Sequence, residues 1–198
     1  MAKVIANMSM SLDGFIAHLD DGVRHLFDWY RDGDVAVPTA NPSMTFHTSA
    51  PSARLLSQMI ADTGALIAGR RQFDYAHGWG DNHPGGAPMF VVTHSVPSGW
   101  PRPGSSINFV TDGLESAVAQ AKAVAGDKIV GVSGASVSQQ LIEAGLVDEI
   151  WVNLIPVLLG SGIPFFAGLT GSIALDGPTI VEGVGVTHLG YRVKGRLP

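Results

Sequence analysis

The sequence predicts an α/β fold in a single domain, and two observations predict it. Short apolar runs typical of buried strands alternate along the chain with segments of helical spacing, the pattern of strand–helix–strand units. The composition agrees, because 45% of the 198 residues are hydrophobic and only 15% are charged. No repeat, low-complexity tract or linker divides the sequence. We therefore expect one domain over residues 1–198.

The first part of the chain predicts a strand, a long loop and a helix. Residues 4–10 predict the strand, which ends at an Asp-Gly turn pair. Residues 20–50 contain many Gly, Pro and Asp breakers and predict an irregular loop, long enough to be typical of a functional loop or lid. Aromatic side chains within this loop indicate that part of it packs against the domain. Apolar residues at helical spacing then predict a helix over 52–63, ended by Gly64.

The second part predicts a regular alternation of strands and helices. Asp112 is a predicted helix N-cap with Glu115 in capping-box spacing, and Gly126 ends that helix. Ser136 begins a second predicted helix, also with capping-box spacing, which ends at Gly145. The expected strands lie at 65–68, 89–92, 107–110, 128–132 and 149–159, with a terminal hairpin over 180–193.

Charge and composition exclude several classes of protein. The net charge is −5 and there is no basic run, which argues against nucleic acid as a partner. The absence of cysteine excludes disulfides, thiolate nucleophiles and iron–sulfur clusters. The 7 histidines include no pair with the helical spacing of a zinc motif, so no metal site is expected. No segment has the length of a membrane span or the apolar run of a signal peptide, which predicts a cytoplasmic protein that does not bind membranes.

Three predicted strands end in small, hydroxyl-bearing or cationic side chains just before a turn or helix. In an open parallel sheet, ligands bind outside the carboxyl ends of the strands. We therefore expect these three junctions to converge on one rim of the sheet. The three junctions are Gly69-Arg70-Arg71, Thr93-His94-Ser95 and Ser133-Gly134-Ala135-Ser136.

The chemistry of the three junctions suits a phosphorylated dinucleotide. Gly134 lets the backbone approach a phosphate closely, and the helix that follows presents unpaired N–H groups. Arg70 and Arg71 provide bidentate positive charge suited to a 2′-phosphate, and Thr93 and Ser95 provide hydroxyl donors. The glycine spacing is not GxGxxG, which disfavours a standard Rossmann site. The alternative is that the glycine only permits tight packing and that the arginines are solvated.

Six segments in order make the chain resemble a known family. They are SLDGFIA (11–17), GRRQFD (69–74), VVTHSVP (91–97), VSGAS (132–136), AGLVDEI (144–150) and PVLLGSGIPFF (156–166). This order resembles the dihydrofolate-reductase-like family, and within it the group related to the reductase domain of riboflavin biosynthesis. The resemblance implies a three-layer αβα fold with a doubly wound, mostly parallel sheet and an antiparallel C-terminal edge. It also implies a homodimeric NADPH-dependent reductase of a small, pterin- or pyrimidine-like substrate.

The resemblance implies roles for residues at the matching positions. Gly69, Arg70 and Arg71 would face the phosphates of NADPH, while Thr93, His94 and Ser95 would hold its 2′-phosphate and adenosine end. The pyrophosphate loop would comprise Ser133, Gly134, Ala135, Ser136 and Val137. The segment near the nicotinamide ring would comprise Leu12, Gly14, Phe15 and Ile16, with Asp13 as the nearest ionisable, and hence candidate catalytic, residue.

Loop aromatics are the candidates for the substrate pocket, namely Trp29, Phe46, Tyr75 and Trp79. Aromatic side chains in loops that cover a cleft can line it, but they can equally form a small core of the loop itself. For the homodimer, the apolar strand 150–159 and residues 164–166 offer surface to bury, and the alternative is that both complete the core of the monomer.

The chain departs from the family pattern at two places. Ser133 stands where the pyrophosphate loop usually has the first of two glycines. The helix start at 52–58 has no Asp or Glu, whereas dihydrofolate reductases place a carboxylate there, so reduction of dihydrofolate itself is not expected. A chain without cysteine also has no zinc deaminase domain of the kind found in bifunctional riboflavin enzymes. Two alternatives remain open: an NADP(H)-binding protein without turnover, and a reductase that uses a flavin or deazaflavin.

Overall fold

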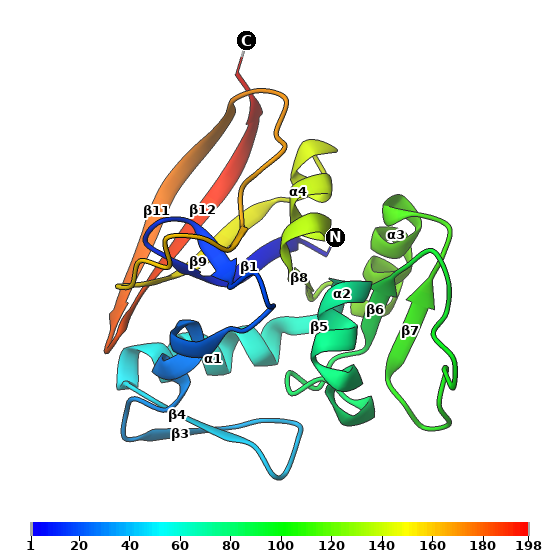
Figure 1. Ribbon diagram of the computed structural model, residues 1–198, viewed down its shortest axis with the longest axis horizontal. Helices are drawn as coiled ribbons and strands as arrows, with labels where there is room; N and C mark the ends of the chain where they lie inside the picture. The colour runs from blue at the N-terminus through cyan, green and yellow to red at the C-terminus, as the bar shows by residue number, and fades with distance from the viewer. Residues whose placement is uncertain (1, 198) are drawn as a thin grey trace.

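A computed structural model describes residues 2–197, and its central feature is an eight-stranded sheet in the order β11-β12-β9-β1-β8-β5-β6-β7 (Figure 1). Six neighbouring strands pair in parallel, and the last two strands of the chain pair antiparallel at one edge. The parallel strands are β1 (Val4–Ser11), β5 (Thr63–Gly69), β6 (Met89–Val92), β7 (Ile107–Val110), β8 (Ile129–Val132) and β9 (Glu149–Ile155). The edge strands are β11 (Ile173–Gly183) and β12 (Val186–Arg196). The predicted mostly parallel sheet with an antiparallel C-terminal edge is confirmed.

Helices cover both faces of the sheet. The helices α3 (Leu114–Ala125) and α4 (Ala135–Glu143) lie on one face, and α1 (Ala50–Asp62) lies on the other. Because successive side chains of a strand point to opposite faces, β1 serves both sides. Val4 packs in the core beneath α3 and α4, whereas its neighbour Ile5 lines a pocket beneath α1. None of the helices within residues 2–197 is long and apolar enough to cross a membrane.

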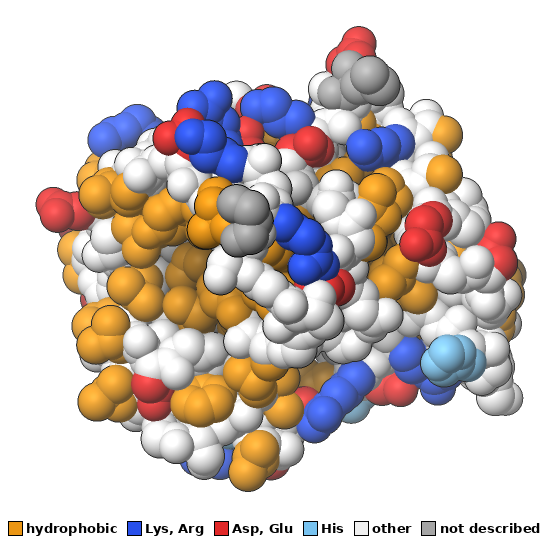
Figure 2. All heavy atoms as spheres, turned by 90° about the horizontal axis from the view of Figure 1, so that it is seen from above, with side chains coloured by type: hydrophobic (Ala, Val, Ile, Leu, Met, Phe, Trp, Pro, Cys, Tyr) orange, Lys and Arg blue, Asp and Glu red, His pale blue; other side chains and the backbone are white. Residues whose placement is uncertain are grey.

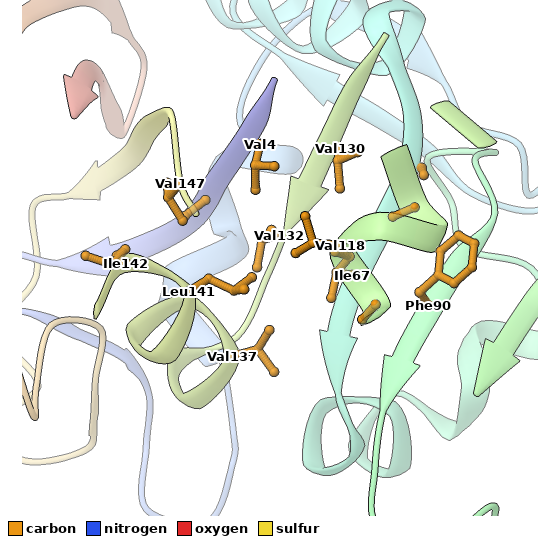
Figure 3. Close-up of a cluster of buried hydrophobic side chains, with 14 of the residues drawn as sticks. Val4, Ile67, Phe90, Val118, Val130, Val132, Val137, Leu141, Ile142 and Val147 are labelled. Carbon is orange, nitrogen blue, oxygen red and sulfur yellow. The ribbon is translucent and has the colours of Figure 1, made fainter. Parts of the chain in front are cut away.

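The main core lies between the sheet and the helices α3 and α4. Figure 3 shows Val130 and Val132 of β8 facing Val118 of α3 and Leu141 of α4. These four side chains are at most 5% exposed. Branched apolar residues on the strands and alanines on α3 allow close contact between the two layers, which explains the low charge content of the sequence.

Residues 20–50 are more ordered than the sequence predicts. They contain a 3-10 helix, η1 (Arg24–Tyr30), and the hairpin formed by β3 (Val35–Pro38) and β4 (Thr45–Thr48). Aromatic stacking joins these elements, with ring centroids of Tyr30 at 4.0 Å from Trp29 and 4.3 Å from Phe46. The prediction of an irregular loop is therefore wrong for much of this segment, while the prediction that its aromatics pack down is confirmed.

Several predicted boundaries also shift. Neither Asp112 nor Ser136 is an N-cap, because α3 and α4 begin after Gly113 and Gly134, and neither helix has a side-chain cap. Those glycines have φ of +109° and +88°, which lets the chain turn sharply into each helix. β9 ends at Ile155, and the remaining short elements are β2 (Phe15–Ala17), α2 (Arg70–Tyr75), η2 (His77–Asp81) and β10 (Ile163–Pro164).

The strand order creates a crevice between β5 and β8. β5 continues through α2 towards β6 on one side, whereas β8 continues through α4 towards β9 on the other. Neighbouring strands whose connections leave in opposite directions form a topological switch point, where ligands of open α/β sheets bind. The Ser133 N–H donates to the Ile67 carbonyl oxygen at 3.0 Å, which holds the two strand ends side by side.

Candidate functional site

A large open cleft lies at the carboxyl ends of the parallel strands, between α3 and α4. Its volume is about 1100 Å³, and we call it the rim cleft. Gly69, Thr93 and Ser136, one from each of the three junctions, all line it. The prediction that the three junctions converge on one rim of the sheet is therefore confirmed.

Two helix N-termini face the rim cleft. Gly113 precedes α3 and Ser136 lies in the first turn of α4, and both residues line the cleft. Since neither helix has a side-chain cap, the first N–H groups of each are free to bind an anion. The cleft therefore fits the phosphate groups of a dinucleotide by its backbone donors as well as by its side chains.

The two arginines of the first junction are already paired. The Arg70 Nε donates to the Asp74 carboxylate at 2.8 Å, and its Nη1 donates to the Ser95 carbonyl oxygen at 3.1 Å. The Arg71 Nε donates to Asp21 at 2.9 Å. Exposed ion pairs of this kind contribute only about 0–1 kcal/mol each. A phosphate in the cleft can therefore compete with Asp74 and Asp21 for these arginines.

The second junction is a small loop held by its own hydroxyl group. The Thr93 Oγ1 donates to the Ser95 carbonyl oxygen at 2.9 Å, and the Ser95 N–H donates back to the same hydroxyl at 3.4 Å. His94 and Ser95 are exposed and line the rim cleft. This loop brings a hydroxyl, an imidazole and the Arg70 side chain together at one end of the cleft.

Gln72 connects the first and third junctions. Its Oε1 accepts a hydrogen bond from the Ser133 Oγ at 3.1 Å and lies 2.8 Å from the position where a Cβ on Gly134 would be. The Gly134 N–H points to the Met8 Sδ at 3.3 Å. Sequence reasoning missed Gln72, although its place directly after the two arginines in the GRRQFD segment was an available signal.

The first turn of α4 packs directly against the first junction. A Cβ on Gly69 would lie 3.1 Å from the Val137 Cγ2, so this position favours glycine. Ser136 and Val137 line the rim cleft, and Ala135 lines the next cavity inward. The predicted pyrophosphate loop therefore separates the two cavities.

Two smaller cavities continue inward from the rim cleft. The junction pocket, of about 350 Å³, shares Gly69 and Val137 with the rim cleft. The inner pocket, of about 320 Å³, shares Gln72 and Trp79 with the junction pocket. Because neighbouring cavities share lining residues, the three adjoin one another in order from the sheet rim to the space beneath α1.

The inner pocket has an apolar wall and a polar floor. The apolar wall comes from α1, η1 and β4 and includes Leu56, Tyr30 and Phe46. The polar floor includes Asn7 of β1 and Asn153 of β9. Sequence reasoning missed both asparagines, although a polar residue inside a predicted buried strand was a usable signal.

The inner pocket carries no formal charge at neutral pH. Among the described residues that line it there is no Asp, Glu, Lys or Arg. Burial lowers the pKa of His83 to about 4 and raises the pKa of Tyr30, so both side chains are uncharged near pH 7. The Nδ1 of His83 accepts the Gly85 N–H at 3.0 Å, which leaves its Nε2 as the protonated ring nitrogen.

The four predicted pocket aromatics divide between two roles. Phe46 and Trp79 line the inner pocket, and Tyr75 lines the junction pocket. Trp29 lines none of the three cavities, because its ring is 4% exposed and its Nε1 donates to the Ser9 Oγ at 3.1 Å. Trp29 therefore belongs to the small core around η1, which is the alternative role that the sequence analysis left open for the loop aromatics.

In the turn after β1, only Ile16 of the predicted residues lines the junction pocket, while Leu12 is 63% exposed. The Asp13 carboxylate accepts hydrogen bonds from the Ser11 hydroxyl at 2.5 Å and from the Leu159 and Gly160 N–H groups at 3.1 and 2.7 Å. The Ser11 hydroxyl, with these backbone donors, lowers the pKa of Asp13. Asp13 lines none of the three cavities, and neither do Gly14 and Phe15. The ionised carboxylate of Asp13 therefore links the turn after β1 to the segment after β9 through these hydrogen bonds.

Comparisons with known proteins agree with this architecture. The family model for the RibD C-terminal domain matches residues 2–192. The uncharacterized protein YwjB of Bacillus subtilis (strain 168) is 25% identical over 173 residues, which are 87% of each chain. Among solved structures, a candidate riboflavin biosynthesis protein from Shewanella sp. PV-4 is 23% identical with a TM-score of 0.71, covering 98% of this chain and 99% of that one.

A dihydrofolate reductase from Enterococcus faecalis, solved with NADP(H), is 16% identical with a TM-score of 0.59, covering 97% of this chain and 96% of that one. The class of protein is therefore a dihydrofolate-reductase-like fold, with its cavities at the switch point of the sheet. Within that class, the chain belongs to the RibD C-terminal domain family. The family resemblance inferred from the six sequence segments is confirmed.

Proposed function

We propose that this protein is an NADPH-dependent reductase of a small heterocyclic substrate. The observation that carries the proposal is the series of adjoining cavities that leads from a phosphate-suited rim cleft to an uncharged, aromatic-walled inner pocket. NADPH supplies the hydride when it is bound, and the protein supplies binding and orientation. The family to which the chain belongs supports oxidoreductase activity.

The residues of the three junctions would hold the cofactor. Arg70 and Arg71 would face its phosphates together with the backbone around Gly69. Thr93, together with the exposed His94 and Ser95 beside Arg70, would hold the 2′-phosphate and adenosine end. The loop from Ser133 to Val137, with the free N–H groups of α4, would hold the pyrophosphate. Of the turn from Leu12 to Ile16, it is Ile16, in the wall of the junction pocket, that would lie near the nicotinamide ring.

The substrate would occupy the inner pocket against Phe46 and Trp79. Among the described residues of that pocket there is no carboxylate to support protonation of a pterin. We therefore assign the proton of the reduction to water and do not propose dihydrofolate as the substrate.

Titration of the purified protein with NADPH and with NADH tests the cofactor assignment. We expect NADPH to bind about tenfold or more tightly, because charge-assisted hydrogen bonds to one phosphate contribute about 1.5–3 kcal/mol. Arg70→Ala should remove most of that preference. Arg102→Ala is the matched control, because Arg102 is also ion-paired and half exposed but lies outside the rim cleft. Equal affinity for both nucleotides, or no binding of either, would contradict the proposal.

A second function, NADP(H) binding without turnover, is supported by Ser133. Its hydroxyl is occupied by Gln72 at a position where the family pattern has glycine. Oxidation of NADPH followed by its absorbance, with pterins, pyrimidines and quinones as acceptors, separates the two functions. Turnover of any acceptor supports the reductase, and binding of NADPH without turnover supports the second function. A yellow chromophore that co-purifies would favour a flavin or deazaflavin instead.

We also propose that the protein forms a homodimer. Figure 2 shows hydrophobic side chains gathered on the side of the molecule where Figure 1 places β11 and β12. The exposed apolar residues of this hairpin are Leu175, Ile180 and Val184. Of the segment expected at the interface, Phe165 is fully buried in the monomer core, whereas Phe166 is 41% exposed.

Light scattering during size exclusion should give twice the monomer mass, and Ile180→Glu should reduce it to the monomer. If both the wild type and Ile180→Glu are dimers, the interface lies elsewhere. If the wild type is a monomer, the homodimer is contradicted.

A further inference from the structure

A chain of buried hydrogen bonds ends at the floor of the inner pocket. Ser52 of α1 contacts the His188 Nε2 of β12 at 2.9 Å, and the His188 Nδ1 contacts the Asn153 Oδ1 at 2.8 Å. The Asn153 Nδ2 then donates to the Asn7 Oδ1 at 3.2 Å. Ser52, His188 and Asn153 are 1%, 1% and 6% exposed. These groups are thus shielded from water and depend on one another for hydrogen bonds.

The chain of hydrogen bonds has a single direction. The Asn153 Oδ1 can only accept, so the His188 Nδ1 carries the proton. The His188 Nε2 therefore accepts from the Ser52 hydroxyl, which in turn accepts from the Ser49 hydroxyl at 3.1 Å. Every member donates towards the pocket. In this arrangement the Asn153 amide presents its Nδ2 as the donor to Asn7, and the Asn7 amide presents its Oδ1 as the acceptor.

His188 must be uncharged for this arrangement, because a protonated imidazole could not accept from Ser52. Burial lowers its pKa to about 4, and the Trp29 ring lies edge-on at 5.1 Å. The neutral form is therefore the one present near pH 7, and the two amides keep one orientation.

We propose that the inner pocket selects an uncharged ring that carries an amide-like edge and no phosphate group, with Asn7 and Asn153 as specificity-determining residues and with His188 and Ser52 as positioning residues. The proposal rests on the proposed function, since it names the substrate class of that site. Two oriented primary amides match the alternating donors and acceptors of a lactam or ureide edge.

The absence of formal charge from the lining provides the discrimination. A protonated ring or a phosphate would be taken from water with no opposite charge to pair with, at a cost of several kcal/mol. The cation in the adjoining junction pocket is Arg71, which also lines the rim cleft and would there face the phosphates of the cofactor. With NADPH bound, the described lining therefore offers a substrate phosphate no free cation.

Two matched pairs of probes test the proposal by calorimetry at pH 6, in the presence and absence of NADPH. Quinazoline-2,4-dione is uncharged, whereas 2,4-diaminoquinazoline has the same shape and is protonated. Uridine and uridine 5′-phosphate differ only in the phosphate. We expect the uncharged member of each pair to bind about tenfold or more tightly. Tighter binding of either charged member, or no binding of any probe, would overturn the proposal.

Asn153→Asp tests the specificity role. The new carboxylate still accepts from His188 but adds a negative charge to the pocket, so the preference should reverse towards 2,4-diaminoquinazoline. Loss of binding to both quinazolines without reversal would indicate only a structural role and would overturn the assignment. Gln58→Ala, on the exposed side of α1, is the matched control and should leave both affinities unchanged.

His188→Leu and His188→Gln test the positioning role. Leucine removes both hydrogen bonds, and the dione should bind about tenfold more weakly. Glutamine restores a donor and an acceptor and should recover at least part of that loss. If His188→Leu does not fold, Ser52→Ala removes the donor to the ring and should weaken the dione in the same way. Equal dione affinity in wild type and His188→Leu, or in wild type and Ser52→Ala if His188→Leu does not fold, would overturn the positioning role.

Measuring NADPH affinity on the same samples separates the two levels of inference. Wild-type protein that binds the dione but not NADPH contradicts the proposed function alone. Protein that binds NADPH and prefers a charged probe contradicts the substrate class alone.

Discussion

Gly134 shows how a single residue shapes the rim cleft. Its φ of +88° and ψ of 156° lie in a region that is essentially restricted to glycine, and it turns the chain from β8 into α4. The Gln72 Oε1 also occupies the space that a side chain would need. The backbone conformation therefore requires glycine here, and an added Cβ would also displace the end of the Gln72 side chain.

We expect Gly134→Ala to lower the free energy of unfolding by about 1–3 kcal/mol and to weaken NADPH binding, because the strain is relieved only by moving the first turn of α4. Chemical denaturation and nucleotide titration check the two effects. Gly145→Ala is the control, since Gly145 also has positive φ but nothing within 4 Å of its added Cβ. It should cost about 1 kcal/mol and leave binding unchanged.

Asp13 is expected to stabilise the fold rather than to donate a proton. Since its pKa is lowered in the folded state, its contribution is present above its unfolded pKa of 3.8 and is lost as the pH falls below that value. Asp13→Asn should therefore destabilise the protein at pH 7 and have a smaller effect at pH 3. Denaturation at both pH values measures this. An equal effect at both would contradict the role of the charge.

At the scale of elements, His188 joins β12, β9 and α1. Its folded pKa of about 4 is below the ordinary histidine value of 6.5, so the unfolded state binds more protons between these values. Stability contributed by the neutral ring is complete above pH 6.5 and is lost as the pH falls towards 4, by up to about 3 kcal/mol. His188→Gln should show a shallower loss of stability from pH 7 to pH 4.5 in urea denaturation. An unchanged pH dependence of the unfolding free energy would contradict this role of His188. Part of that pH dependence should remain in the variant, because burial also lowers the pKa of His83.

The elements also show where local sequence patterns were insufficient. The predicted capping boxes at Asp112 and Ser136 do not form. The N-cap positions are Gly113, one residue after Asp112, and Gly134, two residues before Ser136. Asp112 accepts from the Ser116 hydroxyl at 2.9 Å instead.

The order within residues 20–50 depends on aromatic stacking between η1 and β4, which no local breaker pattern could reveal. In this segment, tertiary contacts overrode local propensity.

At the scale of the whole molecule, the rim cleft joins α2, α3 and α4 around the strand ends. A ligand that binds there only in the folded state stabilises the protein by about 2.7 kcal/mol at 100 times its dissociation constant. For a chain of this size we expect NADPH at that concentration to raise the Tm by about 5–10 °C. Thermal denaturation with NADPH and with an equal concentration of NADH measures the effect, and an equal rise with both would contradict selectivity for the phosphorylated cofactor.

The fold class, the strand-end junctions and the family could be predicted from the amino-acid sequence alone. These follow from periodicity and from motifs such as Gly69-Arg70-Arg71, whose residues are neighbours in the chain. The inner pocket could not be predicted in this way, because Asn7 and Asn153 of its floor, and the Ser52 and His188 side chains behind them, are far apart in sequence. Their hydrogen bonds exist only because the sheet places β1, β9 and β12 side by side beneath α1. The inner pocket is therefore formed by burial and by hydrogen bonds between residues that are far apart in the sequence.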